Sequence, residues 1–138
     1  MARPGKAAIS KATFERLSEF RYQMRRFQRF SEHAARSHGI TPLQYLLLLH
    51  IQGYPGHKHA TVGELAERLQ AQPHGVVALI SRCARRRLVV RKTSQRDRRN
   101  VEVHLSAKGM RLLVKIASLN RSELKTSAKA FSAVFRDS

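Results

Sequence analysis

Basic side chains crowd into two neighbouring stretches of the sequence, residues 82–92 and residues 96–99. Guanidinium and ammonium groups donate hydrogen bonds to phosphate oxygens, and an Arg side chain can also pair bidentately with a guanine edge. The basic residues concerned are Arg82, Arg85, Arg86, Arg87, Arg91, Lys92, Arg96, Arg98 and Arg99. This concentration of donors indicates a surface that binds a polyanion.

The composition of the whole chain supports the same interpretation. The chain has 138 residues, with 27 Lys and Arg against 9 Asp and Glu, so its formal net charge is +18. A field of this strength repels itself within a compact chain and is best explained by a polyanionic partner. Nucleic acid is the first candidate for that partner, and an anionic membrane surface is the second.

The apolar runs are too short to cross a membrane. The longest, residues 45–49, stops at His50, whereas a spanning helix needs roughly 20 apolar residues. The sequence also passes from Met1 into a charged helical pattern without a secretory apolar region. We therefore expect a cytoplasmic protein with no membrane partner.

The single cysteine, Cys83, excludes an intrachain disulfide and any zinc site built on a cysteine pair, which fits a reducing compartment.

Seven histidines raise the question of a metal site. His57 and His59 fall in a loop with no Cys or clustered carboxylates nearby, and a metal site normally requires three or four ligands. We predict no metal and no cofactor. Cys83 is expected to be a small buried apolar side chain. The sequence has no nucleophile–base constellation, no phosphate-cradling Gly loop and no paired acidic motif, so we predict that the chain is not an enzyme.

The spacing of apolar residues predicts a mainly helical chain. Over residues 10–36, large apolar side chains recur every three or four positions, which indicates a long amphipathic helix that Gly39 ends. A second helix begins at the capping pattern of Thr41 and continues to about Gln52. Residues 53–59 contain two Gly and one Pro, so a loop is expected there.

A short helix, a tight turn and another helix are predicted next, which is the helix-turn-helix arrangement. Thr61 opens the short helix with a second capping box, and Pro73 begins the helix after the turn. The apolar face of this last helix consists of Val76, Leu79, Ile80 and Cys83.

Two β-rich segments follow, residues 88–92 and residues 101–105, and the polar basic segment between them predicts a hairpin. Ser106 then caps a final long helix. A helix-turn-helix followed directly by a basic hairpin is a winged helix. The predicted fold class is therefore mainly α with a small β-hairpin wing, in a single domain over residues 1–138.

With these elements in place, the chain resembles the MarR family of winged helix-turn-helix transcriptional regulators over roughly residues 14–135. The most specific block is residues 97–109, Asp-Arg-Arg-Asn-Val-Glu-Val-His-Leu-Ser-Ala-Lys-Gly. It is similar to the family's wing motif of Asp-x-Arg, a strand and Leu-Thr-x-x-Gly, with Ser106 in place of Thr. Further matches are residues 40–44 with the leucines that follow, residues 61–69, and Leu88-Val89.

The resemblance implies a homodimer on a palindromic operator in double-stranded DNA. Residues 10–36 and 106–135 would be the intertwined dimerisation helices, and residues 41–105 the winged-helix DNA-binding core. Two long apolar stripes suit this role independently, because neither could be wholly covered inside a 138-residue monomer. The expected dimer contacts are Phe14, Leu17, Leu124, Phe131 and Phe135.

The helix that begins at Pro73 is expected to lie in the major groove. The expected contacts on this recognition helix are Gln72, His74, Gly75, Val77, Ala78, Arg82, Arg85 and Arg86. Those on the wing are Arg91, Lys92, Arg96, Asp97, Arg98 and Arg99. Asp97 would brace Arg99 by a charge-assisted hydrogen bond while Arg99 reaches the minor groove.

Four positions depart from the family pattern. At Gly75, Val77 and Ala78 relatives often carry Ser, Thr or Arg, and this departure leaves room for thymine-methyl contact or for readout of DNA shape. For Val77 and Ala78, simple helix-surface packing is the alternative. Arg87 stands where the family frequently has a helix-ending Gly. Either Arg87 adopts the left-handed backbone conformation or the helix ends in another way.

We therefore predict a dimeric, sequence-specific, nucleoid-associated transcriptional regulator, a repressor relieved by a small-molecule effector. The candidate effector-pocket residues are Tyr22, Met24, Phe27, Tyr45 and His50. Their ordinary interpretation is core packing. An alternative function is an architectural DNA-binding protein with low sequence specificity, and a third is a membrane-surface protein, which would need an exposed apolar face on a basic helix.

Overall fold

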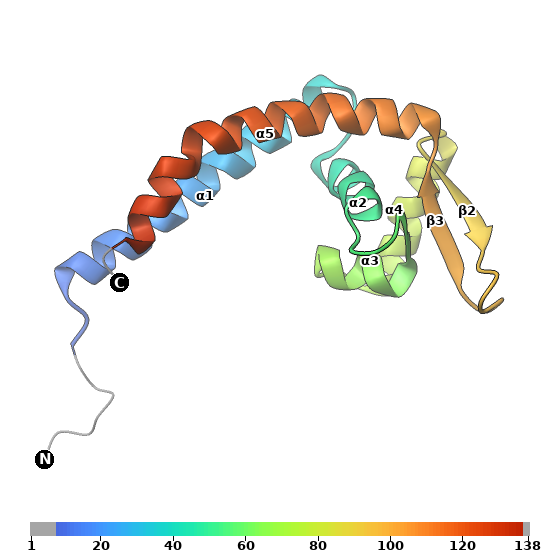
Figure 1. Cartoon of the computed structure of the whole chain (residues 1–138), viewed down its shortest axis with the longest axis horizontal. Coiled ribbons are helices and arrows are strands. Elements are labelled where there is room, and N and C mark those ends of the chain that lie inside the picture. The colour runs from blue at the N-terminus through green and yellow to red at the C-terminus, as the bar shows by residue number, and fades with distance from the viewer. Residues whose placement is uncertain (1–7, 137–138) are drawn as a thin grey trace, which may run out of the picture.

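The computed structural model describes residues 8–136, and this part of the chain forms five helices and three strands. The elements are α1 (Lys11–Ser37), α2 (Pro42–Gln52), β1 (His59–Thr61), α3 (Val62–Leu69), α4 (Pro73–Arg85), β2 (Val89–Thr93), β3 (Val101–Leu105) and α5 (Ala107–Phe135). The long helices α1 and α5 run side by side in opposite directions as an arm (Figure 1). The other elements form a compact unit at one end of this arm. The predicted fold class, mainly α with a small β wing, is confirmed.

Side-chain caps explain where the helices begin. Ser10 caps α1 and Ser106 caps α5, each through its hydroxyl oxygen, which accepts a backbone N–H three residues later. Thr41 and Thr61 start α2 and α3 with complete capping boxes, in which the third helical residue bonds back to the cap. Each such cap is worth about 1 kcal/mol. The two capping boxes predicted from the sequence are therefore confirmed.

The sheet has three strands in the order β1-β3-β2, all antiparallel. The β2–β3 hairpin was predicted, but β1 was missed because residues 53–59 were expected to be a loop. A three-residue strand is too short to show alternation in the sequence. It exists because β3 supplies its hydrogen-bonding partners, with His59 opposite His104 and Thr61 opposite Glu102.

The hydrophobic core lies between the end of α1, α2, α3, α4, the sheet and the first part of α5. Its fully buried side chains include Leu47, Leu48, Ile51, Leu65, Ile80, Leu88, Val103 and Ile116. The predicted apolar face of α4, from Val76 to Cys83, is buried as expected. Because this face is held by the core, the opposite face of α4 is fixed towards solvent. Among the described residues, no helix is long and apolar enough to cross a membrane.

The connection from α4 to β2 is made by Arg87 in the left-handed region, with a φ of 60°. The N–H of Arg87 donates to Ala84 O at 2.9 Å, and the N–H of Leu88 donates to Cys83 O at 2.9 Å. A non-glycine residue in this conformation costs roughly 1–2 kcal/mol. Of the two alternatives for Arg87, the structure has the left-handed one.

The start of α5 packs directly on this turn. The Ser106 hydroxyl donates to Arg87 O at 2.6 Å, and the Ser106 N–H donates to Leu88 O at 3.0 Å. Gly109, one turn later, lies so close that a Cβ built on it would be 2.0 Å from Leu88 O. Only a residue without a side chain permits this approach. The Gly of the wing motif therefore allows α5 to rest on the backbone of Leu88.

Substituting Gly109→Ala is expected to lower the free energy of unfolding by about 1–3 kcal/mol, because the added methyl group must push α5 away from Leu88. Chemical denaturation followed by circular dichroism measures this change. The matched control is Gly63→Ala in α3, where an added Cβ meets nothing within 4 Å. Equal stability of the two variants would contradict the proposed close packing.

Candidate nucleic-acid interface

The solvent face of α4 carries the residues predicted for base contact. Gln72, His74, Gly75, Val77, Ala78, Arg82 and Arg85 are all exposed. Val77 is 47% exposed although it is apolar. Because an α-helix has 3.6 residues per turn, these positions share one side of α4, and the other side is buried in the core. The structure thus gathers seven of the eight predicted recognition-helix residues on one open surface.

The N-terminus of α4 has no side-chain cap. Gln72 is the N-cap residue, but its side chain makes no capping hydrogen bond, and Pro73 occupies the first turn. The first N–H groups of a helix and its macrodipole attract anions when no side chain occupies them. This end of α4 is therefore suited to a phosphate group.

The wing presents a second set of exposed basic side chains, namely Lys92, Arg96, Arg98 and Arg99. Its tip is shaped by the buried Ser94, which was not singled out in the sequence. The Ser94 hydroxyl oxygen accepts hydrogen bonds from the backbone N–H groups of Arg96 at 3.3 Å and Asp97 at 3.4 Å. The backbone N–H of Ser94 donates to Asn100 O at 2.9 Å. These bonds set the course of the basic loop.

Asp97 makes a different contact from the one predicted. Its Oδ1 accepts the backbone N–H of Arg99 at 3.0 Å, and among the described residues no ion pair joins the two side chains. An Asp readily bonds the backbone two residues further on and so closes a turn. The predicted brace on the Arg99 guanidinium is wrong, because the carboxylate holds the backbone of the tip instead.

Two other predicted contacts already have partners within the chain. Arg86 Nη1 donates to Gly39 O at 2.6 Å and lies 3.5 Å from Gln44 Oε1, so it ties the end of α4 to the turn between α1 and α2. Arg91 Nη2 donates to Ser81 Oγ at 2.6 Å, which links β2 to α4. We therefore leave Arg86 out of the interface and regard Arg91 as a residue that positions the wing.

The predicted effector-pocket residues lie in separate surroundings. Tyr45 is in the core, where burial raises the pKa of its phenol. Tyr22 is 54% exposed, with the Arg26 guanidinium 5.7 Å from its ring centre. Burial, with a smaller contribution from Arg68, lowers the pKa of His50. Met24 and Phe27 are partly buried on α1.

The predicted dimer contacts lie on the arm. Phe14 and Leu17 are each 55% exposed, and Leu124 is 46% exposed. Phe131 packs edge-on against Phe20 within the chain, at 6.2 Å between ring centres. The side chain of Phe135 lies outside the described part of the structure. The arm therefore leaves apolar side chains of both α1 and α5 in contact with solvent.

Cys83 behaves as predicted for a buried apolar side chain. It has no exposed surface, and burial raises the pKa of its thiol to about 11. The thiolate is the reactive form of cysteine. At neutral pH the protonated Cys83 is therefore a packing residue of α4 and not a nucleophile.

Comparison with known proteins agrees with this geometry. Residues 38–100, which contain α2 to β2 and the wing tip, match the MarR family. This part of the chain is therefore similar to MarR-family domains. The family match agrees with the prediction that the chain is not an enzyme.

Over 71 residues the chain is also 30% identical to the HTH-type transcriptional repressor MdtR of Bacillus subtilis (strain 168), an alignment covering 51% of this chain and 44% of that protein. The chain thus spans less than half of this curated relative.

Solved MarR structures share the fold over most of the chain. A MarR family protein from Bacillus stearothermophilus superposes with a TM-score of 0.73 at 22% identity, covering 90% of this chain and 85% of that chain. A mutant MarR from E. coli complexed with operator DNA gives a TM-score of 0.65 at 20% identity, covering 78% and 74%. At these identities the likeness establishes the fold, the long helices of the arm included.

Replacing Arg86 by Ala should lower the free energy of unfolding by about 1 kcal/mol, because the Gly39 carbonyl loses its hydrogen bond. The loss stays small because water can bond to this exposed carbonyl instead. Thermal and denaturant unfolding measure the change. Arg85→Ala is the matched control, because it removes the same charge from the same helix end. If both variants were equally stable, the assigned role of Arg86 in joining α4 to the α1–α2 turn would be refuted.

Proposed function

We propose that this protein is a homodimeric, sequence-specific DNA-binding transcriptional regulator. The observation that supports this function best is the exposed face of α4 beside a basic wing, on a MarR-family winged helix. No acidic side chain lies on α4. Its solvent face therefore offers donors to phosphates and base edges without an internal competitor.

The roles of individual residues follow from their positions. In a winged helix the recognition helix enters the major groove, where Arg82 would donate bidentately to a guanine. Val77 and Ala78 suit contact with thymine methyl groups. The wing side chains Arg96, Arg98 and Arg99 would follow the phosphates into the minor groove.

The homodimer is supported by the exposed apolar residues of the arm. A pair of long helices that leaves Phe14, Leu17 and Leu124 in water is unfavourable for an isolated chain. Covering them with the arm of a second copy would set two recognition helices at a fixed separation. Such a dimer reads a palindrome with half-sites about one helical turn apart.

Repression and its relief are further parts of the proposal. The relative MdtR is named a repressor. The simplest effect of a protein bound to an operator is to block transcription. A small molecule would relieve repression by binding better to a dimer with another helix separation. The candidate residues for the site of this small molecule are Tyr22, Met24, Phe27, Tyr45 and His50. Action at the nucleoid follows from the same proposal.

An architectural DNA-binding role is the second candidate, because the net charge of +18 alone would give tight, sequence-tolerant binding. The two functions differ in the ratio of specific to non-specific affinity, which is typically at least about a thousandfold for a regulator. Salt dependence is steep in both cases and does not separate them.

Selection from random duplex pools at about 0.15 M salt, with excess non-specific competitor, should enrich one palindrome. Arg82→Ala should then weaken binding to that site by about 1–3 kcal/mol and relax preference at one base pair. Lys115→Ala, which removes an exposed charge from α5, should leave the preference unchanged. Tight binding without any enriched sequence would favour the architectural protein.

Leu17→Glu should shift the protein from dimer to monomer in sedimentation equilibrium, because it places a charge in the apolar surface of the arm. Val77→Glu is the control: an exposed apolar residue of similar accessibility on α4, expected to stay dimeric while losing DNA affinity. A wild-type protein that sediments as a monomer would exclude the arm as a dimer interface.

A further inference from the structure

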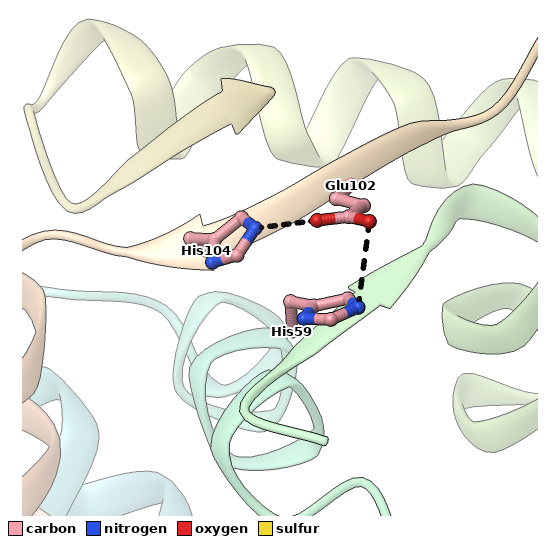
Figure 2. Close-up of side chains that lie close together, drawn as sticks. All are labelled: His59, Glu102 and His104. Carbon is pink, nitrogen blue, oxygen red and sulfur yellow. Dashed lines mark hydrogen bonds and ion pairs between the residues drawn. The ribbon is translucent and has the colours of Figure 1, made fainter. Parts of the chain in front are cut away.

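Three potential metal ligands meet on the outer face of the sheet, at the root of the wing. Glu102 and His104 are two residues apart on β3, so alternation places both on the same face. His59 on β1 stands directly opposite His104 in the strand register. We call His59, Glu102 and His104 the wing-root cluster. Figure 2 shows both imidazole rings turned towards the Glu102 carboxylate.

The distances within the wing-root cluster are those of a nearly assembled site. Glu102 Oε1 lies 2.9 Å from His104 Nε2, and Glu102 Oε2 lies 3.6 Å from His59 Nε2. One ligand atom from each residue can be chosen so that all lie within 4.8 Å of one another. Ligands bound to one tetrahedral Zn²⁺ at about 2.0–2.1 Å are separated by roughly 3.3 Å. Small side-chain rotations would therefore bring all of them onto one ion.

The surroundings leave these groups partly buried but open to solvent. They line a groove of about 550 Å³ between β1, β3 and the wing tip. The three side chains are 22–27% exposed. The groove thus leaves an incoming ion access to water.

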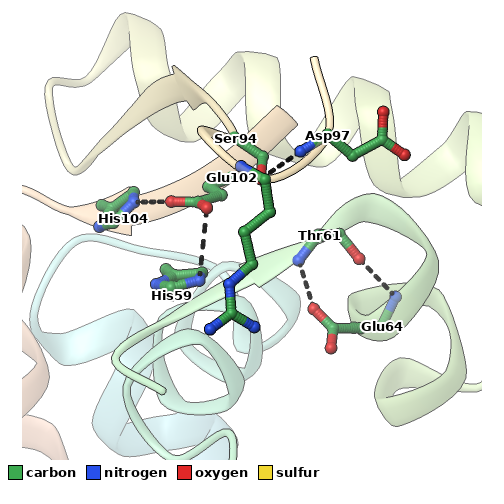
Figure 3. Close-up of polar contacts among 8 residues, drawn as sticks. His59, Thr61, Glu64, Ser94, Asp97, Glu102 and His104 are labelled. Atoms are coloured by element: carbon green, nitrogen blue, oxygen red, sulfur yellow. Dashed lines mark hydrogen bonds and ion pairs between the residues drawn. The ribbon is translucent and has the colours of Figure 1, made fainter. Parts of the chain in front are cut away.

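Neighbouring groups define the limits of the site. Figure 3 shows Glu64 paired with Thr61, and it is occupied there as the capping partner, because the Thr61 N–H donates to Glu64 Oε1 at 2.9 Å. The His57 ring lies 4.8 Å from that of His59, between ring centres, and is not part of the cluster. Lys92 and Arg96 also line the groove, and their charges would weaken the affinity for a cation. The fourth ligand is therefore expected to be water.

We propose that the wing-root cluster binds one divalent transition-metal ion, with Zn²⁺ as the best match. Two imidazoles and one carboxylate suit Zn²⁺, Co²⁺ or Ni²⁺ and do not suit Ca²⁺ or Mg²⁺, which prefer oxygen ligands. The bound ion would join β1 to β3. Because β1 leads directly into α3, the ion would also fix the wing relative to the helix-turn-helix.

Sequence reasoning predicted no metal because the His57-His59 loop had no carboxylate nearby. The missing ligands are on β3, and only the pairing of β1 with β3 brings them to His59. The signal present in the sequence was the Glu-x-His spacing of residues 102–104 within an alternating strand. It could not be connected with His59 while β1 was unrecognised.

The test uses the full-length, untagged protein with ZnCl₂ or CoCl₂ alone. Isothermal titration calorimetry should show one ion bound per chain. Co²⁺ should give visible bands without the thiolate band of a cysteine ligand, and Zn²⁺ should raise the melting temperature. These readouts do not depend on DNA binding, so they can fail or succeed independently of the proposed function.

Glu102→Gln and His104→Gln should each weaken binding of the metal ion by more than about 100-fold. Loss of a residue that only hydrogen-bonds to a ligand costs about 10–100-fold, and loss of a ligand itself should cost more. His33→Gln, at an exposed position on α1, is the matched control and should bind the metal ion as the wild type does. Circular dichroism without metal verifies that each variant is folded. Absence of stoichiometric binding by the wild type, or unchanged binding by both cluster variants, would overturn the proposal.

Discussion

The backbone of Leu88 is the point on which the arrangement of the functional elements depends. It follows the left-handed Arg87 at the end of α4, begins the path into β2, and accepts the N–H of Ser106 while Gly109 packs against its carbonyl. Lys108 Nζ adds a bond to Arg86 O at 2.9 Å. Helix α4, the wing and the arm therefore meet at this one turn and are joined there by backbone contacts.

A second constraint is the use of the few acidic side chains. In the winged-helix unit, Glu64 caps α3 and Asp97 closes the wing turn. Glu67 accepts a hydrogen bond from Gln70, and Glu102 pairs with His59 and His104. Each carboxylate is engaged locally, and none neutralises the exposed arginines of α4. The positive surface is thus free for a polyanion, while the acidic groups stabilise the elements that carry it.

Much of the fold could be predicted because its signals are local. The capping patterns at Thr41 and Thr61, the apolar periodicity of α1 and α4 and the alternation of β3 each involve residues within a few positions of one another. The exposed face of α4 followed from the same periodicity. Asp97 was misjudged because its carboxylate had two competing local partners, the backbone and the side chain of Arg99, and sequence alone does not rank them.

The sequence by itself determined the charge, the order of helices and strands, and which face of each helix is apolar, since these depend on composition and short spacing. Only the tertiary structure decided that Arg86 bonds to Gly39 O and that His59 lies opposite His104. Both contacts join residues far apart in the chain. Their formation depends on how the packed core sets the elements against one another, which local patterns do not encode.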